Sequence, residues 1–523
     1  MITNTAIHQH PMSRARGRIL MIYPEQGFSG TYVKHAPLSL LYASAEVVKA
    51  GYDVRILDTR IDADWRATLS RWLAEGPSLC AGISVMSGRP IDNAIAIGRA
   101  IKALAPDLPV IWGGPHPTFY PESILRDEWS CDYVLSGYAS QGFRQFADAL
   151  NQGGPLDLVE GLSWREGGEI RRNPAADKSF ENIPWQDIPY HLISDYSVYG
   201  QLDQGRTIFS MYSALGCPYQ CSFCSSPAQY APIKGKKWVR LEAKDIADHV
   251  QHVVETYGAN YIYFIDDDSF PKLDHVRQVI AAIRERHLPV KLGFRGARIN
   301  EIKRMDDEFL SMLVEAGTDI MHIGAESGSD RILQLIRKDC TARDIIEVNR
   351  KLARHPQITA AYNIMMGVPT ETLAELRQTR DLMLQLVADH PNCIIFPPNK
   401  FRPLPGTELY KLAENKWGYR MPQSLAEWAN IEVEGKANKG WYEPGMERFF
   451  NLLLVGSYFI DNKIAKLTQG RTWFFRLARL INHFYRPIAM FRLRRGLTFA
   501  LIEYWGYRLF TRQMSRSKGL SSP

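Results

Sequence analysis

Residues Cys217 to Cys224 have the sequence CPYQCSFC and directly follow a predicted strand that begins near Ile208. Three thiols at these spacings on one tight loop suit an iron–sulfur cluster or zinc, because soft thiolates select those metals. Zinc normally takes four ligands, commonly from paired C-x2-C units, and no second Cys pair or His cluster follows. Three cysteines on a [4Fe–4S] cluster would leave one iron without a protein ligand and open to a cosubstrate.

Downstream of this loop, short apolar runs alternate with helical stretches. The helical stretch Leu241–Tyr257 places Ile246, Val250 and Val253 on one face, as expected for a helix that packs on a sheet. The strand candidates recur about every 30 to 40 residues, the length of one strand-plus-helix unit. The pattern predicts a parallel α/β barrel, complete or partial, over residues 206–410, with strands at Tyr261–Ile265, Val290–Phe294, Ile320–Ile323, Ala361–Met366 and Cys393–Phe401.

Upstream, residues 18–150 show a second alternating series, which predicts a doubly wound α/β domain. Ligands of such domains bind beyond the carboxyl ends of the strands, where this chain has three turns rich in small residues: Ser84–Pro90, Gly113–Thr118 and Ser136–Ser140. The predicted strands are Ile19–Tyr23, Asp53–Leu57, Cys80–Val85, Pro109–Trp112 and Asp132–Leu135.

Three further segments complete the predicted organisation. Residues 1–17 form an N-terminal extension, and residues 151–205 form a linker with a hairpin at Leu162–Arg171. Residues 411–523 form a mostly helical region. Between Lys463 and Lys518 this region has thirteen Lys or Arg and one acidic residue, Glu503, which predicts a basic amphipathic helix.

Composition excludes several other classes of protein. The 523 residues are 45% hydrophobic and 23% charged, which is typical of globular domains and not of disordered chains. Seven cysteines in so long a chain do not make a disulfide framework, and we expect Cys80, Cys131, Cys340 and Cys393 to be structural thiols. No signal-peptide pattern or membrane-spanning run is present, so we expect a cytoplasmic protein with a peripheral membrane contact as one alternative.

The cysteine loop resembles the C-x3-C-x-F-C signature of the radical S-adenosylmethionine (SAM) enzymes. The resemblance continues over about 200 residues in the family's order, which goes beyond what a single motif carries. The matching stretches are Phe264–Phe270 (FIDDDSF), Ile323–Ser329 (IGAESGS), Met366–Glu371 (MGVPTE) and Arg402–Leu409 (RPLPGTEL).

The resemblance implies a set of cofactor ligands. Cys217, Cys221 and Cys224 would hold a [4Fe–4S] cluster whose open iron chelates SAM. Glu326 and Ser327 would meet the polar end or ribose of SAM, although an ion pair between Glu326 and Arg298 is the alternative. The remaining residues implied for SAM are Phe223 near the adenine, Arg298 at the carboxylate, Met366, and Asp267 as one of three consecutive carboxylates at a strand end.

A doubly wound domain ahead of such a barrel resembles the cobalamin-dependent subgroup of this family. The D-x-H-x-x-G motif that supplies an axial His to cobalt is absent, and the corresponding turn is Asp58-Thr-Arg-Ile-Asp62. The cobalt would therefore be five-coordinate or have another lower ligand; His116, between two prolines, is more simply a turn residue. The residues that the resemblance implies for cobalamin are Ser84, Ser87, Gly113, Gly114, Gly137 and Tyr138.

The implied fold is a Rossmann-like cobalamin-binding domain, a partial TIM-type radical SAM barrel and a helical basic C-terminal region. The implied activity is methyl transfer from SAM through cobalamin to an unactivated carbon of a small-molecule or lipophilic intermediate, with flavodoxin or ferredoxin as electron donor. A tetrapyrrole-type cyclase and a non-catalytic cobalamin or iron–sulfur sensor are the alternatives. No motif identifies the residues that act on the substrate.

The basic C-terminal region has three interpretations. It could cover the barrel mouth, contact an anionic membrane surface, or bind nucleic acid. Nucleic acid is the weakest of these, because no RNA-binding motif is present.

Overall fold

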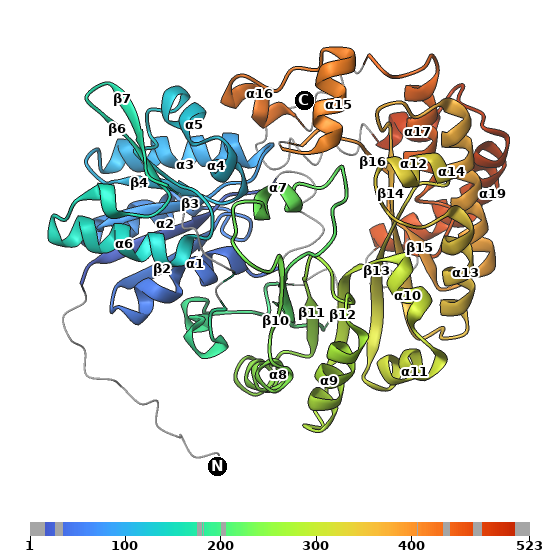
Figure 1. The fold of residues 1–523 in the computed structure, drawn as a ribbon, viewed down its shortest axis with the longest axis horizontal. Coiled ribbons are helices and arrows are strands. Elements are labelled where there is room, and N and C mark those ends of the chain that lie inside the picture. Colours follow the sequence, from blue (N-terminus) through green and yellow to red (C-terminus); the bar gives the residue numbers. More distant parts are fainter. Residues whose placement is uncertain are drawn as a thin grey trace.

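The computed structural model describes residues 16–26, 35–174, 180, 182–199, 205–404, 406–431, 440–463 and 473–507. The predicted extension at residues 1–17 lies almost entirely outside these residues. The described chain forms two α/β halves side by side; of the C-terminal helices, α15 (Glu408–Trp417) and α16 (Leu425–Asn430) lie along the top in this view, and α17 (Met446–Gly456) and α19 (Trp473–Arg495) lie beside the second half (Figure 1). No helix in the described part of the chain is both long and apolar enough to cross a bilayer.

The first sheet confirms the doubly wound domain. Its strand order is β2-β1-β3-β4-β5-β6-β7, with parallel pairing up to β5. The predicted hairpin is present as β6 and β7, and it extends this sheet in antiparallel fashion beside β5. The strands are β1 (Arg18–Tyr23), β2 (Asp53–Asp58), β3 (Cys80–Ser84), β4 (Val110–Gly113), β5 (Tyr133–Leu135), β6 (Leu162–Glu166) and β7 (Glu169–Arg172).

Alternate residues of these strands face two separate cores. Leu20 and Ile22 of β1 pack toward α2 and α3, whereas Ile19 and Met21 pack toward α1 and α6. The strand order reverses between β1 and β3, which is where such sheets open a crevice for ligands. The helices of this half are α1 (Leu38–Lys49), α2 (Trp65–Ala74), α3 (Pro90–Leu104), α4 (Pro115–Phe119), α5 (Pro121–Asp127) and α6 (Ala139–Gln152).

The second sheet is an open parallel half-barrel, which confirms the partial form of the predicted barrel. Its order is β8-β11-β12-β13-β14-β15, and β16 pairs with the end of β14. Among the described strands, β8 and β15 are the two edges and do not pair with each other. The strands are β8 (Ile208–Met211), β11 (Tyr261–Phe264), β12 (Lys291–Ala297), β13 (Thr318–Glu326), β14 (Thr359–Met366), β15 (Cys393–Ile395) and β16 (Asn399–Lys400).

Helices cover the outer face of the half-barrel. Phe264 and Phe294 stack at 5.1 Å under this layer, and both are buried. Thr372 begins α14 with a reciprocal cap, because its hydroxyl accepts from Glu375 N while the Glu375 carboxylate accepts from Thr372 N. The helices are α8 (Ala243–Tyr257), α9 (Leu273–Arg284), α10 (Ile299–Arg304), α11 (Asp307–Glu315), α12 (Asp330–Leu335), α13 (Ala342–Ala353) and α14 (Leu373–Asp389).

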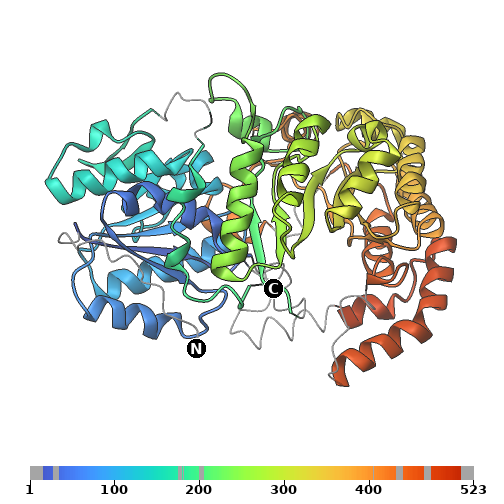
Figure 2. The same cartoon turned by 90° about the horizontal axis from the view of Figure 1, so that it is seen from below.

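The C-terminal region returns to both halves. Within it, α16 packs on the N-terminal half, where Trp428 is buried 4.6 Å from the Tyr120 ring and 5.3 Å from the His116 ring. The other helices lie beside the half-barrel (Figures 1 and 2). The helices are α15 (Glu408–Trp417), α16 (Leu425–Asn430), α17 (Met446–Gly456) and α19 (Trp473–Arg495).

Candidate active site and cofactor cavity

The cysteine loop connects β9 (Ala214–Gly216) to the short helix α7 (Ser226–Tyr230). β9 forms a small antiparallel ribbon with β10 (Trp238–Arg240). Gly216 precedes the loop with φ of +78°, and a Cβ there would lie 2.2 Å from the Lys237 carbonyl oxygen. Only glycine fits this position, so the path of the chain into the loop is fixed.

The three thiols of the loop suit a cluster better than a single ion. Cys217, Cys221 and Cys224 are all half-buried and unpaired in disulfides. No three His, Cys, Asp or Glu side chains in the described ranges converge closely enough to ligate one metal ion. A cubane differs, because each thiolate binds a different iron and the sulfurs stay farther apart than around one ion. The donor set therefore fits a three-thiolate [4Fe–4S] cluster.

Arg298 ties the cysteine loop to the loop that follows α12. Its Nη1 donates to Cys221 Sγ at 2.9 Å, and its Nη2 donates to the Lys338 carbonyl oxygen at 3.0 Å. The guanidinium also lies 3.9 Å from the centre of the Tyr219 ring and is almost fully buried. Arg298, which is predicted to reach the SAM carboxylate, thus places a positive charge next to Cys221, a predicted cluster ligand.

Glu326 ends β13 in a left-handed conformation, with φ of +65°. Its Oε1 accepts from Lys338 Nζ at 3.3 Å, and Lys338 is 7% exposed. Glu326 therefore pairs with Lys338, and the alternative ion pair with Arg298 is not formed; Arg298 instead lies 3.5 Å from Asp339. The strained backbone of Glu326 holds its carboxylate beside the buried ammonium at the carboxyl edge of the half-barrel.

The other residues implied for SAM do not all gather at one place. Ser327 is buried, and its hydroxyl accepts from Ser329 N and lies 3.3 Å from Thr379 Oγ1, which is a structural arrangement. Met366 is buried at the end of β14, and Phe223 is half-buried within the cysteine loop.

The three consecutive carboxylates after β11 have separate roles. Asp266 is buried and accepts from Ser213 N at 2.7 Å, so it fixes the turn between β8 and β9. Asp268 is buried beside Glu301, and burial together with that neighbour raises its pKa well above the usual range. Asp267 accepts from the Tyr230 hydroxyl and lines the large cavity between the two halves. Of the three carboxylates, Asp267 is the one that faces this cavity, and its predicted contact with SAM stays a prediction.

That cavity has a volume of about 360 Å³ and lies at the reversal point of the first sheet. It extends inward between the sheet and two helices, where Met21, Leu40 and Phe143 line it. Tyr212 and Asp267 face it from the half-barrel. The residues predicted for cobalamin that line it are Ser84, Gly113, Gly114, Gly137 and Tyr138.

Two of its glycines leave room that a side chain would fill. A Cβ on Gly113 would have no neighbour closer than the Leu135 carbonyl oxygen at 3.9 Å, and a Cβ on Gly137 would meet nothing within 4 Å. Gly114 is different, because a Cβ there would lie 3.0 Å from the Val85 carbonyl oxygen; its φ of +107° and the φ of +84° at Gly137 both favour glycine. The cavity is thus an apolar recess behind a glycine-rich rim, which fits a large ring with an inserted tail.

Ser87 and His116 lie apart from the cavity wall. His116 is fully buried in α4, its Nδ1 lies 3.0 Å from Ser87 Oγ, and its ring packs on Trp428. Burial lowers the pKa of His116 to about 4, so the imidazole is neutral. The predicted turn residue is therefore a core residue under α16, and Ser87 holds it in place.

The inner face of the half-barrel contains functional candidates that no motif indicated. Tyr263, Arg295 and His322 alternate along their strands with residues that face the outer helices, so they face inward. His35, from the N-terminal half, stacks on Tyr263 at 5.2 Å and lies 2.9 Å from Ser210 Oγ. In the sequence, only the alternation of residues along the strands could have indicated that Tyr263, Arg295 and His322 face inward. Nothing in the sequence could have indicated His35, because it comes from a different domain.

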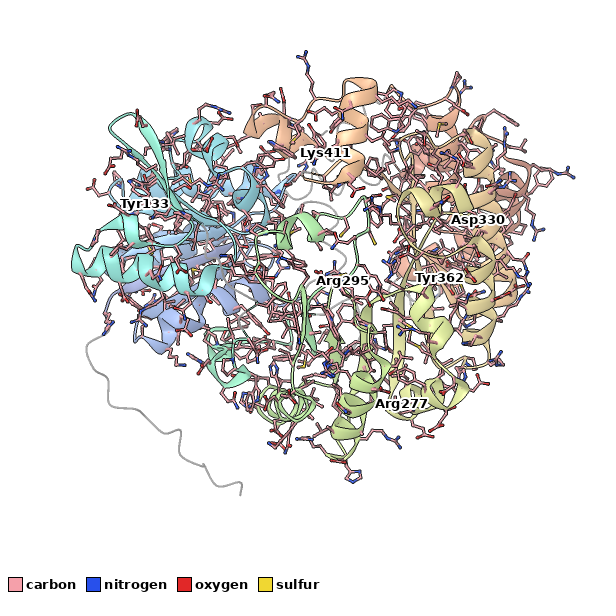
Figure 3. All side chains as sticks on the ribbon, in the orientation of Figure 1. Tyr133, Arg277, Arg295, Asp330, Tyr362 and Lys411 are labelled. Atoms are coloured by element: carbon pink, nitrogen blue, oxygen red, sulfur yellow. The ribbon has the colours of Figure 1, made fainter. Side chains whose placement is uncertain are left out.

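Arg295 is the charged member of this layer. Burial and the neighbouring guanidinium lower the pKa of His322 to about 4, and burial with Arg60 and Arg295 does the same for His35. Arg295 is exposed and has no side-chain hydrogen bond or ion pair with any residue that the structure describes. It lies on the inner side of the half-barrel, toward the centre of the molecule (Figure 3).

At the amino ends of the strands, the interior of the half-barrel is closed by three polar side chains that contact one another: Arg206, Tyr261 and Asp319. Asp319 accepts from Arg206 Nη2 at 2.7 Å and from the Tyr261 hydroxyl at 2.5 Å. The Arg206 guanidinium lies 4.5 Å from the centre of the Tyr261 ring. A ligand would therefore enter the half-barrel from the side of the cysteine loop and would contact Arg295 on the inner face.

Comparison with known families gives two matches in series. The family model for the radical SAM superfamily matches residues 211–383, and the model for the B12 binding domain matches residues 31–147. The first range covers the half-barrel from the end of β8 into α14, and the second covers the N-terminal half from before α1 into α6, with β2 to β5 but without β1, β6 and β7.

Individual proteins match over most of this chain. The chain is 26% identical to an uncharacterized methyltransferase of Pyrococcus horikoshii, over 72% of this chain and 78% of that protein. It is 23% identical to the anaerobic magnesium-protoporphyrin IX monomethyl ester cyclase of Synechocystis, over 94% and 97%. It superposes with a TM-score of 0.63 and 19% identity on the radical SAM methyltransferase TsrM of Kitasatospora setae with cobalamin and a [4Fe–4S] cluster bound, over 79% and 81%.

Proposed function

We propose that this chain, which belongs to the B12-binding radical SAM enzymes, transfers a methyl group from SAM to an unactivated carbon of a small-molecule or lipophilic intermediate. The cofactors of the family are a [4Fe–4S] cluster, SAM and cobalamin. When bound, the cluster supplies the electron that cleaves SAM, and cobalamin carries the methyl group.

One observation supports a catalytic role, such as methyl transfer, above that of a sensor. The cavity that contains Gly113 and Gly114 is bounded on its other side by Tyr212 and Asp267 of the half-barrel. A ring held in this cavity would therefore have one face toward the barrel interior, where a substrate would lie. A cobalamin that served only as a sensor would need no such opening toward the SAM-binding half.

The residues around the cysteine loop hold and orient the cofactors. Arg298 donates to Cys221 Sγ and keeps the cysteine loop against the loop after α12. Lys338 is held by Glu326 at the carboxyl edge of the half-barrel, where the polar end of SAM is expected. Asp267, with Tyr230 hydrogen-bonded to it, presents a carboxylate to the cobalamin cavity.

The substrate that this interior suits carries an anionic group. Arg295 is a guanidinium in the middle of the inner face, above the closed end formed by Asp319 and Arg206. The two imidazoles beside it, His35 and His322, are neutral, so they donate or accept hydrogen bonds without adding charge. A carboxylate or phosphate paired with Arg295 would orient the rest of the substrate toward the cysteine loop.

A cyclase is the second candidate, because the match to the Synechocystis cyclase extends over 94% of this chain. Both activities require a low-potential electron for the cluster, which we propose comes from a flavodoxin or a ferredoxin.

The deciding experiment uses the anaerobically reconstituted holoenzyme with SAM labelled in its methyl group, a strong reductant and a metabolite extract of the source organism. Methyl transfer predicts an extract component that gains one labelled methyl group, together with 5′-deoxyadenosine. A component that loses hydrogens or gains oxygen without label would establish the cyclase. An intact cluster that forms no 5′-deoxyadenosine would overturn both activities and favour the sensor.

A further inference from the structure

Large apolar side chains on the surface concentrate in one short segment near the C-terminus. In the described chain, fourteen large hydrophobic side chains are exposed, and eight of them lie between residues 480 and 505. The other six are scattered over the first 170 residues. We call the eight the apolar stripe: Leu480, Ile481, Phe484, Ile488, Phe491, Phe499, Ile502 and Trp505.

The stripe occupies one face of α19 and continues beyond its end. At about 100° per residue, its five members in α19 fall within an arc of about 100°. Ala489 and Leu493 lie on the opposite face and are buried, and Leu493 packs against Gly456 of α17. Because the helix is attached through this opposite face, the stripe points away from the protein, at the outer end of the molecule (Figure 2).

The surroundings of the stripe are positively charged. Residues 473–507 contain six arginines, no lysine and one acidic residue, Glu503. Glu503 is neutralised by Arg492 at 3.3 Å. Arg476 and Arg494 are exposed at one edge of the stripe, and Arg495 is exposed one turn beyond Phe491, the last member of the stripe in α19. The predicted basic amphipathic helix is thus present.

This helix does not cover the barrel mouth, which was the first interpretation of the region. Its buried face packs on α17 and α14, on the outer side of the half-barrel, and the apolar stripe is left uncovered. The stripe gathers eight large exposed side chains within residues 480–505, whereas single exposed hydrophobic residues would need no explanation.

We propose that the apolar stripe lies in the interface of an anionic lipid bilayer, with the flanking arginines at the lipid phosphates. Exposed Phe, Ile, Leu and Trp on one face with arginines at its edges is the pattern of helices that lie in the plane of a membrane. Because this inference rests on the surface of residues 473–507 alone, it is independent of the proposed reaction.

A second copy of the chain fits the stripe less well. A two-fold contact would place the same patch on itself, so that two surfaces with several arginines each and a single, already paired acidic residue would meet. Charge complementarity therefore favours lipid phosphates over another copy of this surface.

The test is vesicle flotation of the full-length holoprotein with phosphatidylcholine vesicles that contain or lack phosphatidylglycerol. We expect binding to the anionic vesicles that weakens with salt. The double variant Phe484→Ser/Phe491→Ser should bind at least roughly tenfold more weakly. The variant Arg494→Gln/Arg495→Gln should lose the preference for phosphatidylglycerol. The matched control Trp129→Ser/Leu158→Ser removes two exposed hydrophobic residues outside the stripe and should bind like the parent.

Light scattering in the absence of lipid completes the experiment. Failure of the parent protein to float with anionic vesicles, or equal loss of binding in the control, would overturn the proposal. So would a dimeric parent that becomes monomeric in Phe484→Ser/Phe491→Ser without any vesicle binding, since the stripe would then be an interface between copies. All four proteins remain comparable if they retain the same cluster absorbance and thermal midpoint.

Discussion

Arg298 allows a quantitative test of the cluster environment that needs no substrate. The change is Arg298→Gln, which removes a buried positive charge that lies 2.9 Å from Cys221 Sγ. A cation beside a cluster ligand stabilises the reduced cluster, because reduction adds negative charge. The variant should therefore have a lower reduction potential than the parent protein.

The size of the shift follows from the strength of the lost interaction. A hydrogen bond to a charged group contributes about 1.5–3 kcal/mol, and about 59 mV corresponds to 1.4 kcal/mol for one electron, which sets an upper limit of about 130 mV. The Cys221 sulfur accepts the hydrogen bond in both oxidation states of the cluster, so only the difference in bond strength between the two states shifts the potential. We therefore expect the reduction potential to decrease by between about 30 and 130 mV.

The assay is an EPR-monitored redox titration of the reconstituted proteins without SAM. Arg298→Lys keeps the charge but not the planar pair of donors, so its potential should lie between those of the parent and Arg298→Gln. Arg295→Gln removes an arginine of the same half-barrel that does not contact the cysteine loop, and its potential should be unchanged. The reasoning is refuted if Arg298→Gln holds an intact cluster at the parent potential, or if Arg295→Gln shifts the potential equally.

Three further outcomes are expected. Gly113→Val should fill the cavity and reduce retained cobalamin, measured by absorbance, whereas Gly154→Val, outside the cavity, should not; equal retention would contradict the assignment. Arg295→Gln should raise the KM for an anionic substrate at least roughly tenfold, whereas Arg277→Gln on the outer surface should leave it unchanged. Burial raises the pKa of Glu371 to about 8, above its usual 4.5, so protonation of this carboxyl group favours folding at low pH. The contribution to the free energy of unfolding is lost as pH rises from about 4.5 to 8, by up to about 1.4 kcal/mol per pH unit. Glu371→Gln should remove this part of the pH dependence of the thermal midpoint.

Periodicity and turn composition were enough to predict the two sheets. Each strand of the first domain is a short buried run such as Ile19–Tyr23, and each is followed by a helix with one apolar face. The glycine turn at Gly113 and Gly114 also follows from local sequence, because only small residues let a large ligand approach the backbone. Local sequence patterns predict local structure well, which is why the glycine-rich turns that line the cavity could be predicted from the sequence.

Contacts between distant segments were not predictable from the sequence. The pairing of Glu326 with Lys338 depends on the path of the chain around α12, and no spacing rule indicates it. His35 reaches the half-barrel from the other domain, and Trp428 buries His116 from more than 300 residues away. The hairpin at Leu162–Arg171 was predicted as part of a linker, because nothing local shows that it adds to the first sheet.

The return of α16 to the N-terminal half has a consequence for how the protein is made. The chain emerges from the ribosome N-terminus first, so the first α/β half is complete about 250 residues before Trp428 is synthesised. Until then, the ring of His116 lacks the indole that covers it in the finished protein. The surface beneath α16 therefore stays exposed to solvent until the last fifth of the polypeptide arrives, and α16 then covers it, whereas the contacts of His35 with the half-barrel can form earlier.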